Sequence, residues 1–390
     1  MIAKTSPYIL LGAVLGLLGL GFSMLVSVGP YVANGAGSLN GAGGTLNPNA
    51  EAWKQAGFAG VGLLALGAGA FLDYRGYARW SWVAYVLIVI ALALCLMPHV
   101  GVVKNGAKRW IRLGSIILQP SEFAKPVVIA TVAAWCAKHR ELRGTFLAGF
   151  AYPLLIVLLP VVLIGVETDL GNATLLAVGS LVVLFAAGTR PLHLAVLVLG
   201  GASALAAAVW YNPERMGRIL AFWDLEKYKS GDGLQQWLSL TAFASGGEWG
   251  LGIGNSRQKM WSLPYPNTDF ISPIIGEELG LWACMLMVLG YVCITLAAVA
   301  IAIHAPDRFG KLLGFGLAIL IGFQTVIHLG VTTGMLPNKG MPLPFVSAGG
   351  SNLVCLLFSV GVLFNIYRQA RHLDRECDPV LRNRKITPSL

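Results

Sequence analysis

The run YILLGAVLGLLGLGFSMLVSVGP, residues 8–30, contains no charged side chain, and it decides the class of fold. At 1.5 Å per residue, ~20 apolar residues in a helix cross the ~30 Å hydrocarbon core of a bilayer. Only helices and closed barrels satisfy their own backbone groups there. Barrel strands alternate apolar and polar residues, which this run does not. It also exceeds the 7–15 apolar residues of a signal peptide, so we predict a retained transmembrane helix.

Similar apolar runs recur along the rest of the chain. We predict spans at 8–30, 56–72, 81–98, 122–137, 147–165, 171–188, 192–210, 272–302, 312–331 and 351–367. The composition agrees, because 56% of the 390 residues are hydrophobic and only 12% are charged, against about 25% charged in soluble domains. The predicted fold is therefore an all-α polytopic membrane protein with about ten transmembrane helices.

The distribution of Lys and Arg predicts the orientation. Ten spans place both termini on one side, and the termini with the short loops of that side hold more than half of the 28 Lys and Arg residues. Positive loops face the cytoplasm, so we predict a multi-pass protein of the bacterial cytoplasmic (inner) membrane with both termini cytoplasmic. Residues 1–367 would form one transmembrane domain and 368–390 a basic cytoplasmic tail. A large outer loop, about 211–271, would join the seventh and eighth spans.

Cations on the outer side break this pattern. Lys104, Lys108, Arg109 and Arg112 all lie in the outer loop before the fourth span. They could be a tolerated violation of the charge rule, or a sign of inverted topology. We favour a third interpretation, in which they hold an anionic substrate such as a pyrophosphate, because Arg and Lys bind phosphate through charge-assisted hydrogen bonds.

Several classes of function are disfavoured by what the sequence lacks. It has no GxxxxGK[ST] loop and no GxGxxG opening a βαβ unit, so it carries no nucleotide-binding motif of either type. Its six cysteines form no CxxC pair and its six histidines are scattered, so we expect no disulfide and no metal site built from protein ligands. We expect no nucleic-acid partner. Any substrate must come from the bilayer or from outside.

Two polar motifs precede the fourth and sixth predicted spans. In QPSEFAKP, Glu122 and Lys125 are i,i+3 neighbours at a helix start, with Ser121 as the candidate N-cap. In ETDLGN, Asp169 lies just before the sixth span. Both have structural interpretations, a self-neutralising ion pair for the first and a helix cap for the second. The functional interpretation is a polar wall that faces a shared cavity.

Two further motifs precede the eighth and tenth spans. Asp269 in NTDFI is either the N-cap of the next helix or a general base whose pKa is raised at a partly desolvated membrane edge. The run LPNKGMPLPFVSAGGS carries Lys339 and Ser347 among prolines and glycines that forbid a regular helix. Irregular backbone at this depth is tolerated where it lines a cavity, and its N–H groups with Lys339 could hold an anion.

In this order, the runs KRWIRLGSIILQPSEFAKP, ETDLG, GIGNSRQKMWSLP, NTDFI, GEELG and LPNKGMPLPFVSAGGS resemble the SEDS family of cell-wall polymerases (shape, elongation, division and sporulation). The resemblance covers about residues 101–367. AFWD, GIGNSRQK and Pro-Leu-Pro look closer to the division member FtsW than to the elongation member RodA. Asn267 departs from a usual His, and Ala348 from a frequent Tyr. Glu167-Thr168 stand in place of the common Gln-Pro.

The resemblance implies a peptidoglycan glycosyltransferase that polymerises lipid II on the periplasmic face during cell division, with undecaprenyl pyrophosphate as the leaving group. It implies Asp269 as the catalytic residue, Glu122 and Lys125 as cavity residues, and Asp169 as the acid of the DLG motif. The implied partners are lipid II, a class B penicillin-binding protein that acts as transpeptidase, and other divisome membrane proteins.

In the predicted mechanism, Asp269 takes the proton of the acceptor sugar's 4-hydroxyl in one inverting displacement. The leaving pyrophosphate needs its charge balanced, alone or with a divalent cation such as magnesium. The predicted substrate-binding residues are Lys108, Arg109, Glu122, Lys125, Asp169, Lys339 and Ser347. We expect a groove near the fourth, fifth and seventh spans to admit the prenyl tail.

Two functions of other classes remain open at the level of the sequence. The same charged cavity would suit a transporter that flips the lipid-linked precursor, although the sequence shows no inverted repeats that would favour transport. A scaffold that recruits a penicillin-binding protein is the other alternative.

Overall fold

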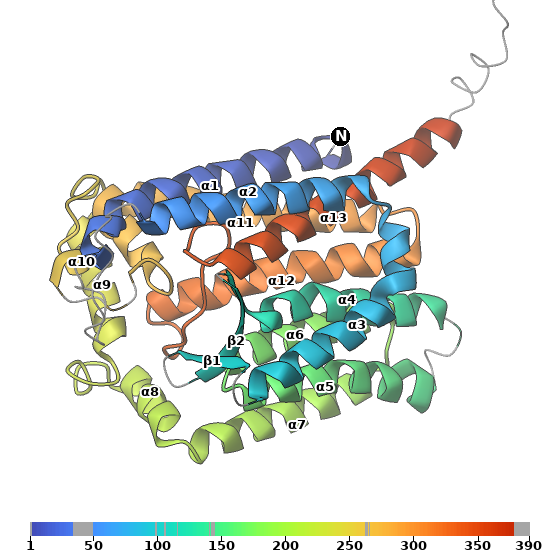
Figure 1. The fold of residues 1–390 in the computed structure, drawn as a ribbon, viewed down its shortest axis with the longest axis horizontal. Helices are drawn as coiled ribbons and strands as arrows, with labels where there is room; N and C mark the ends of the chain where they lie inside the picture. Colours follow the sequence, from blue (N-terminus) through green and yellow to red (C-terminus); the bar gives the residue numbers. More distant parts are fainter. Residues whose placement is uncertain are drawn as a thin grey trace, which may run out of the picture.

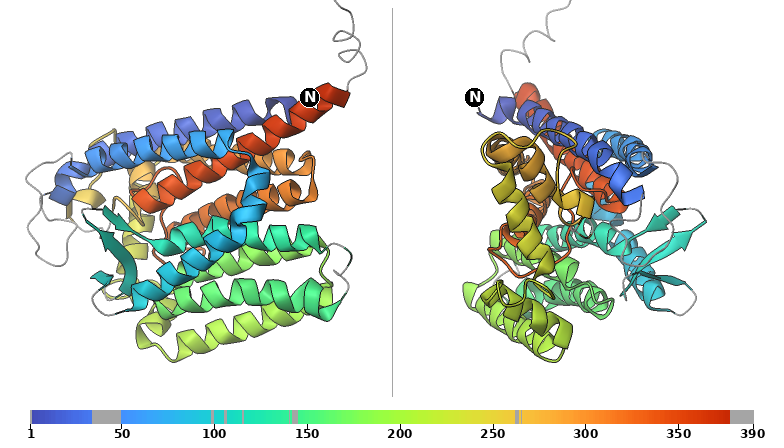
Figure 2. Two further views of the ribbon diagram at one scale, coloured as in Figure 1. Left: turned by 45° about the vertical axis from the view of Figure 1, so that its right-hand side comes forward. Right: turned by 90° about the vertical axis from the view of Figure 1, so that its left-hand side faces the viewer.

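The computed structural model describes residues 2–33, 50–97, 100–104, 107–114, 116–139, 141, 145–261, 264 and 266–377. Within these ranges, long and roughly parallel helices form a bundle that carries a small sheet and short helices at one end (Figures 1 and 2). The long helices are α1 (Ile2–Ala33), α2 (Ala50–Phe71), α3 (Tyr74–Leu96), α4 (Pro120–Lys138), α5 (Tyr152–Val166), α6 (Leu170–Ala187), α7 (Pro191–Trp210), α11 (Ile271–Ile303), α12 (Arg308–Thr332) and α13 (Gly350–Cys377). A π-helical turn, η2 (Leu147–Ala151), leads into α5.

Each predicted span corresponds to one of these helices. In the described part of the chain, eight helices are long and apolar enough to cross a membrane: α1, α3, η2 with α5, α6, α7, α11, α12 and α13. The other two, α2 and α4, have 22 and 19 residues, or about 33 and 29 Å of helix. Both carry a charged pair in their first turns and run alongside the other spans (Figure 1). The predicted class, an all-α polytopic membrane protein, is confirmed.

At the end of the bundle opposite the sheet, short polar turns determine where the helices begin and end. Asp73 caps α3 by accepting from the Arg75 N–H at 2.9 Å, and Asp307 caps α12 through the Gly310 N–H at 2.6 Å. Such caps satisfy backbone N–H groups that a helix start leaves without partners. Gly188 ends α6 at φ 89°, in the left-handed region that favours glycine. These turns keep consecutive spans antiparallel and close together.

The two ends of the bundle differ. The start of α1 and the last turns of α13 lie at the same end (Figures 1 and 2). The opposite end carries the sheet and three short helices, α8 (Pro213–Trp223), α9 (Leu234–Gly246) and α10 (Gln258–Trp261). This arrangement fits both termini on one side, while the cytoplasmic assignment stays a prediction. Residues 34–49, between the first two predicted spans, and the tail from 378 onward lie outside the described residues.

The small sheet is an addition that the sequence analysis did not predict. Its antiparallel strands are β1 (Gly101–Lys104), β2 (Ala107–Leu113) and β3 (Ile116–Leu118), with β2 in the middle. Ile111 pairs with Gly101 on one side and with Leu118 on the other. The two edge strands contain two Val and two Ile, and β-branched residues favour extended backbone. The sheet matters because it carries the outer cations.

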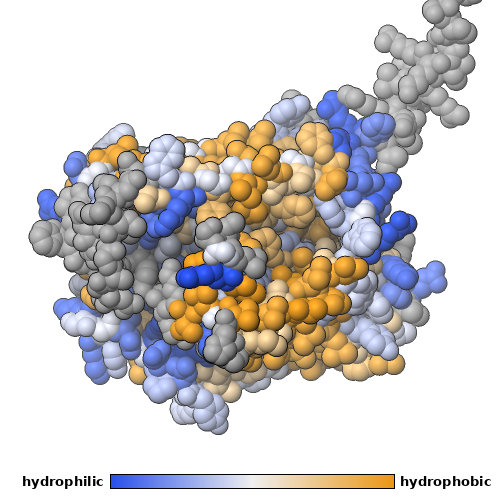
Figure 3. Space-filling model, viewed as in Figure 1, coloured by the Kyte–Doolittle hydropathy of each residue, from blue (hydrophilic) through white to orange (hydrophobic). Residues whose placement is uncertain are grey.

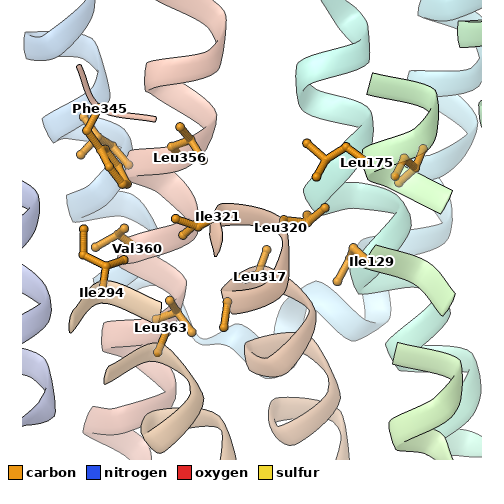
Figure 4. Packing of buried hydrophobic residues seen from close by; sticks show 14 of the residues in the cluster. Ile129, Leu175, Ile294, Leu317, Leu320, Ile321, Phe345, Leu356, Val360 and Leu363 are labelled. Carbon is orange, nitrogen blue, oxygen red and sulfur yellow. The ribbon is translucent and has the colours of Figure 1, made fainter. Parts of the chain in front are cut away.

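The helices α4, α6 and α12 pack closely in the core, and this packing brings three of their polar side chains together one or two turns away. A Cβ at Gly316 of α12 would lie 2.5 Å from Cγ2 of Ile129 in α4, and one at Gly179 of α6 would lie 2.8 Å from Cδ2 of Leu320. Figure 4 shows Ile129, Leu317 and Leu320 at this crossing. The glycines therefore let α4, α6 and α12 approach closely. One or two turns farther along, the same helices carry Lys125, Asn172 and Gln324.

On the face that Figure 3 shows, apolar residues cover most of the middle of the bundle, and hydrophilic residues gather toward its two ends. A cavity of about 340 Å³ opens between α2, α3, α4, α12 and α13, on the face hollowed in Figure 3. Its walls are almost wholly apolar and include Phe123, Val127, Leu317 and Phe358. A hollow of this kind at membrane depth suits a hydrocarbon chain.

Candidate active site

The fourth helix opens with a buried ion pair. Gln119 is its N-cap and Pro120 its first residue, so the prediction that Ser121 caps the helix is wrong. The Nζ atom of Lys125 lies 2.7 Å from Oε2 of Glu122, and the two side chains are 5% and 2% exposed. The geometry therefore agrees with the structural interpretation of this motif, an ion pair whose two charges neutralise each other. Burial of both charges means that other groups must satisfy their remaining hydrogen-bonding capacity.

Three other helices supply those groups. Asn172 of α6 donates to Oε1 of Glu122 at 3.0 Å and accepts from Lys125 at 3.1 Å. Asn352 of α13 donates to Oε2 of Glu122 at 2.6 Å, and Gln324 of α12 accepts from Lys125 at 3.4 Å. The pair is thus the centre of a polar network that joins α4, α6, α12 and α13. Fully satisfied networks of this type fix a single packing arrangement.

Asp169 joins the same network from the start of α6. It is the N-cap of that helix, and it accepts from the Asn172 N–H at 3.2 Å and from Nδ2 of Asn172 at 3.0 Å. Nε2 of Gln119 donates to it at 3.1 Å. The capping interpretation of Asp169 is confirmed. Because Asn172 also holds Glu122, the structure brings these two predicted site residues together.

Asp269 lies just before α11 but does not cap it. Phe270 is the N-cap, without a side-chain hydrogen bond, so the interpretation of Asp269 as N-cap is wrong. The Asp269 carboxylate lies against the backbone of Gly340, since a Cβ there would be 2.5 Å from Oδ2 and 3.2 Å from Cγ. Only glycine leaves room for the carboxylate in this position. The loop between α12 and α13 therefore forms one wall beside the predicted base.

Lys339, the neighbour of Gly340, links that wall to the Asp169 end. Its Nζ donates to the Leu170 carbonyl at 3.0 Å, and Gly171 leaves space for its side chain, because a Cβ at Gly171 would lie 3.3 Å from Cε of Lys339. Burial lowers the pKa of Lys339 to about 8, and the negative charge of Asp169 opposes this shift. A lysine with this pKa is mostly protonated at neutral pH, and an anion beside it would favour the charged form further.

Ser347 fastens the loop to the segment that carries Asp269. Its hydroxyl donates to the Thr268 carbonyl at 2.6 Å and accepts from the Leu343 N–H at 2.8 Å. The Ala348 N–H donates to the Asn267 carbonyl at 2.9 Å. Two positions that depart from the family pattern, Asn267 and Ala348, thus meet through their backbones. The geometry gives Ser347 a positioning contact next to Asp269.

The two predicted cations of β2 diverge. Successive residues of a strand face opposite ways, and Lys108 is exposed whereas Arg109 is partly buried. An Arg109 Nη atom donates to the Thr168 carbonyl at 3.0 Å. The structure therefore brings Arg109 to the turn between α5 and α6, beside Asp169, and leaves Lys108 on the outward face.

Glu167 is a residue that the sequence analysis did not select. It is 1% exposed, and no N–H or O–H donor among the described residues reaches either carboxyl oxygen. Burial raises its pKa to about 8, the charge of Asp169 adds to the shift, and Arg109 opposes it. The next residue, Thr168, has φ 64°, which is strained for a β-branched side chain. The signal in the sequence was two acids two residues apart at a membrane edge.

The raised pKa of Glu167 predicts a pH-dependent stability. Between pH 4.5 and about 8 the unfolded chain has lost the proton that the folded chain keeps, so stability falls as pH rises and levels off above. Glu167→Gln cannot ionise and is expected to lose this dependence. Its melting temperature in detergent should exceed the parent's by several degrees at pH 8 and above, and match it near pH 4.5.

The control is Glu226→Gln, which removes a carboxyl from an exposed position of the outer segment. It should follow the parent across the pH range. If the melting temperature of Glu167→Gln also followed that of the parent, the pKa of Glu167 in the folded chain would be that of an ordinary glutamate. A structural change would then have to expose its carboxyl group to water.

The sequence profile of the family described as "Cell cycle protein" (FtsW, RodA and SpoVE) matches residues 10–372. This chain belongs to that family. Stage V sporulation protein E of Bacillus subtilis (strain 168) is 37% identical over 319 residues, 82% of this chain and 87% of the relative. The probable peptidoglycan glycosyltransferase FtsW of Nitrosococcus halophilus (strain Nc4) is 35% identical over 370 residues, 93% and 92% of the two chains.

Solved structures of the FtsW/RodA/SpoVE family share the fold. A chain from a peptidoglycan synthase complex, described as coordinating polymerization and crosslinking, superposes with a TM-score of 0.75 at 27% identity, over 93% of this chain and 97% of that one. RodA of Thermus thermophilus gives a TM-score of 0.66 at 27% identity, over 93% and 96%. The predicted family is confirmed, and with it the multi-pass membrane fold.

Proposed function

We propose that this chain polymerises lipid II into glycan strands on the periplasmic face of the bacterial cytoplasmic membrane during cell division, with undecaprenyl pyrophosphate as the leaving group. The enzyme class is that of its relatives, several of which are named peptidoglycan glycosyltransferase FtsW. One observation carries the proposal. The Asp269 carboxylate lies against Gly340 of the loop between α12 and α13, and the preceding residue of that loop is the partly buried Lys339.

Acid and cation have separate tasks in this proposal. Asp269 removes the proton of the attacking sugar hydroxyl, a step in which a positioned base contributes about 10²–10⁴-fold. Lys339 and Arg109 balance the negative charge that develops on the departing pyrophosphate. With its pKa of about 8, Lys339 is mostly protonated at neutral pH, so it already carries the positive charge that the pyrophosphate needs. A divalent cation such as magnesium could share this task.

The apolar cavity suits the prenyl chain, which is the hydrocarbon part of a lipid-linked substrate. It meets the Glu122–Lys125 network through Pro126, Leu317, Cys355 and Ser359, which line both the cavity and the small hollow at the ion pair. A prenyl chain in the cavity would leave its headgroup near that network. Of the fourth, fifth and seventh spans predicted to form the groove, only the fourth borders this cavity, because α2, α3, α12 and α13 form its other walls.

The partners follow from the same chemistry. A polymerase of glycan strands needs an enzyme that crosslinks them, and the complex with the similar fold is described as coordinating those two activities. We therefore propose a class B penicillin-binding protein as transpeptidase partner, with other divisome membrane proteins around it. Both termini would lie in the cytoplasm, as the charge distribution predicts.

One experiment separates the polymerase from the transporter and the scaffold. The purified chain is placed in vesicles that contain fluorescent lipid II, with and without a class B penicillin-binding protein. We expect glycan polymer on the outer side and no movement of lipid II between leaflets. Translocation without polymer would support the transporter. Absence of both polymer and translocation, with and without the added partner, would support the scaffold.

A further inference from the structure

A line of polar side chains on α12 plays no part in the mechanism described so far. Gln324, His328 and Thr332 recur every fourth residue, so they share one face of the helix. They are 1%, 1% and 0% exposed, respectively. Polar groups are costly inside a membrane protein unless each is hydrogen-bonded. Their partners therefore indicate what this face of α12 is for.

His328 contacts the two chain segments that meet at Asp269. Its Nδ1 lies 2.7 Å from the Met341 carbonyl oxygen, and its Nε2 lies 3.0 Å from the Ser272 hydroxyl. A carbonyl can only accept, so in the neutral ring Nδ1 carries the hydrogen and Nε2 accepts from Ser272. Each nitrogen thus has one defined partner. Such a two-sided contact fixes the orientation of the ring and the separation of its partners.

Both partners are close to Asp269 along the chain. Ser272 is in the first turn of α11, three residues after Asp269, and Met341 follows Gly340, against which the carboxylate lies. The spacing between these two segments decides whether the carboxylate lies beside Gly340 and Lys339 or is displaced. His328 spans that spacing from a third element, α12.

Gln324 supports the same assignment from one turn earlier. Its Nε2 donates to the Pro342 carbonyl at 2.9 Å, while its Oε1 accepts from Lys125. Two consecutive carbonyls of the loop, those of Met341 and Pro342, are therefore held by one face of α12. Gln324 connects the loop to the ion-pair network, and His328 connects it to the Asp269 segment.

We infer that His328 is a positioning residue for Asp269: its Nδ1–H holds the Met341 carbonyl, and so keeps Gly340 and Lys339 in register with the carboxylate. The inference rests on the proposed function of Asp269 as general base. His328 touches no substrate in this scheme. Its effect is on the geometry of the base, and displacement of a reacting group by about 1 Å can cost on the order of 10²-fold in rate.

The test uses polymerisation of fluorescent lipid II by the full-length chain with its transpeptidase partner. In His328→Ala we expect kcat to fall about 10- to 100-fold with KM nearly unchanged. In His328→Asn the side-chain amide takes the place of Nδ1–H, so most of kcat should return. Thr325→Val is the matched control, because Thr325 is a buried α12 residue whose hydroxyl, among the described residues, bonds within its own helix, to the Ile321 carbonyl at 3.0 Å.

The outcomes separate the two levels of the proposal. If Asp269→Asn polymerises as well as the parent, the proposed function fails, whatever the His328 variants do. If Asp269→Asn is inactive but His328→Ala keeps full kcat, or His328→Asn is no better than His328→Ala, the positioning role is overturned. Should His328→Ala not fold, the comparison of His328→Asn with His328→Gln decides, because Gln reaches only toward Ser272 and should not restore kcat.

Discussion

Replacing Asp269 by Asn is expected to lower the polymerisation rate by about 10²–10⁴-fold, the contribution typical of a positioned general base. The amide keeps the size of the carboxyl group but cannot take the proton of the sugar hydroxyl at neutral pH. The fold should survive, because Phe270 and not Asp269 caps α11. The measurement is the initial rate of polymer formation from fluorescent lipid II, with melting temperature as the check on folding.

The matched control for Asp269 is Glu226→Gln, an exposed acid in the same outer segment, which should polymerise like the parent. Gly340→Ala approaches the same geometry from the opposite side. Its Cβ would come within 2.5 Å of Oδ2 of Asp269, so the carboxylate must move and the rate must fall. Parent-like activity in Asp269→Asn would remove this residue from the mechanism. Loss in Asp269→Asn with full activity in Gly340→Ala would mean that the carboxylate acts from another position.

The spans were predictable because the physics that sets them is local. An apolar run long enough to cross the bilayer has no alternative to a helix, and the predicted 192–210 differs by one residue from α7. The sheet of residues 101–118 was missed for the opposite reason. Its strands are short. Strand pairing depends on contacts between the strands, and so few alternating apolar and polar residues do not specify which strands pair. Without the sheet, the opposite orientations of Lys108 and Arg109 could not be known.

The polar network shows where prediction of the site stops. Glu122, Lys125 and Asp169 were found because charge in or beside a span is costly and therefore conspicuous. Asn172, Gln324 and Asn352 were not, since a single amide in an apolar run gives little signal. Their importance lies in partners on other helices, at separations in sequence of up to 230 residues. His328 belongs to the same class: its two partners, Ser272 and Met341, lie on either side of it in the chain.

Lys125→Met is expected to destabilise the folded chain by about 3–5 kcal/mol, because it leaves Glu122 as a buried carboxylate without its counter-charge. Asn172 and Asn352 still donate to Glu122, but neutral donors do not replace an ammonium at 2.7 Å. Chemical denaturation in detergent measures the loss. The matched control is Lys54→Met, which breaks a pair of the same i,i+3 spacing that is 60% and 34% exposed, and should cost no more than about 1 kcal/mol.

The double variant Glu122→Gln, Lys125→Met then decides between the structural and functional interpretations of this pair. Removing both charges together avoids the unpaired carboxylate, and buried pairs replaced in this way often lose little stability or none. If the pair serves only to neutralise itself, the double variant should both fold and polymerise lipid II. If the pair and its network hold the headgroup where the apolar cavity meets the polar end of the bundle, the double variant should fold, retain its melting temperature and still fail to polymerise. The arrangement of Lys125 between Glu122, Asn172 and Gln324, next to that cavity, leads us to expect the second result.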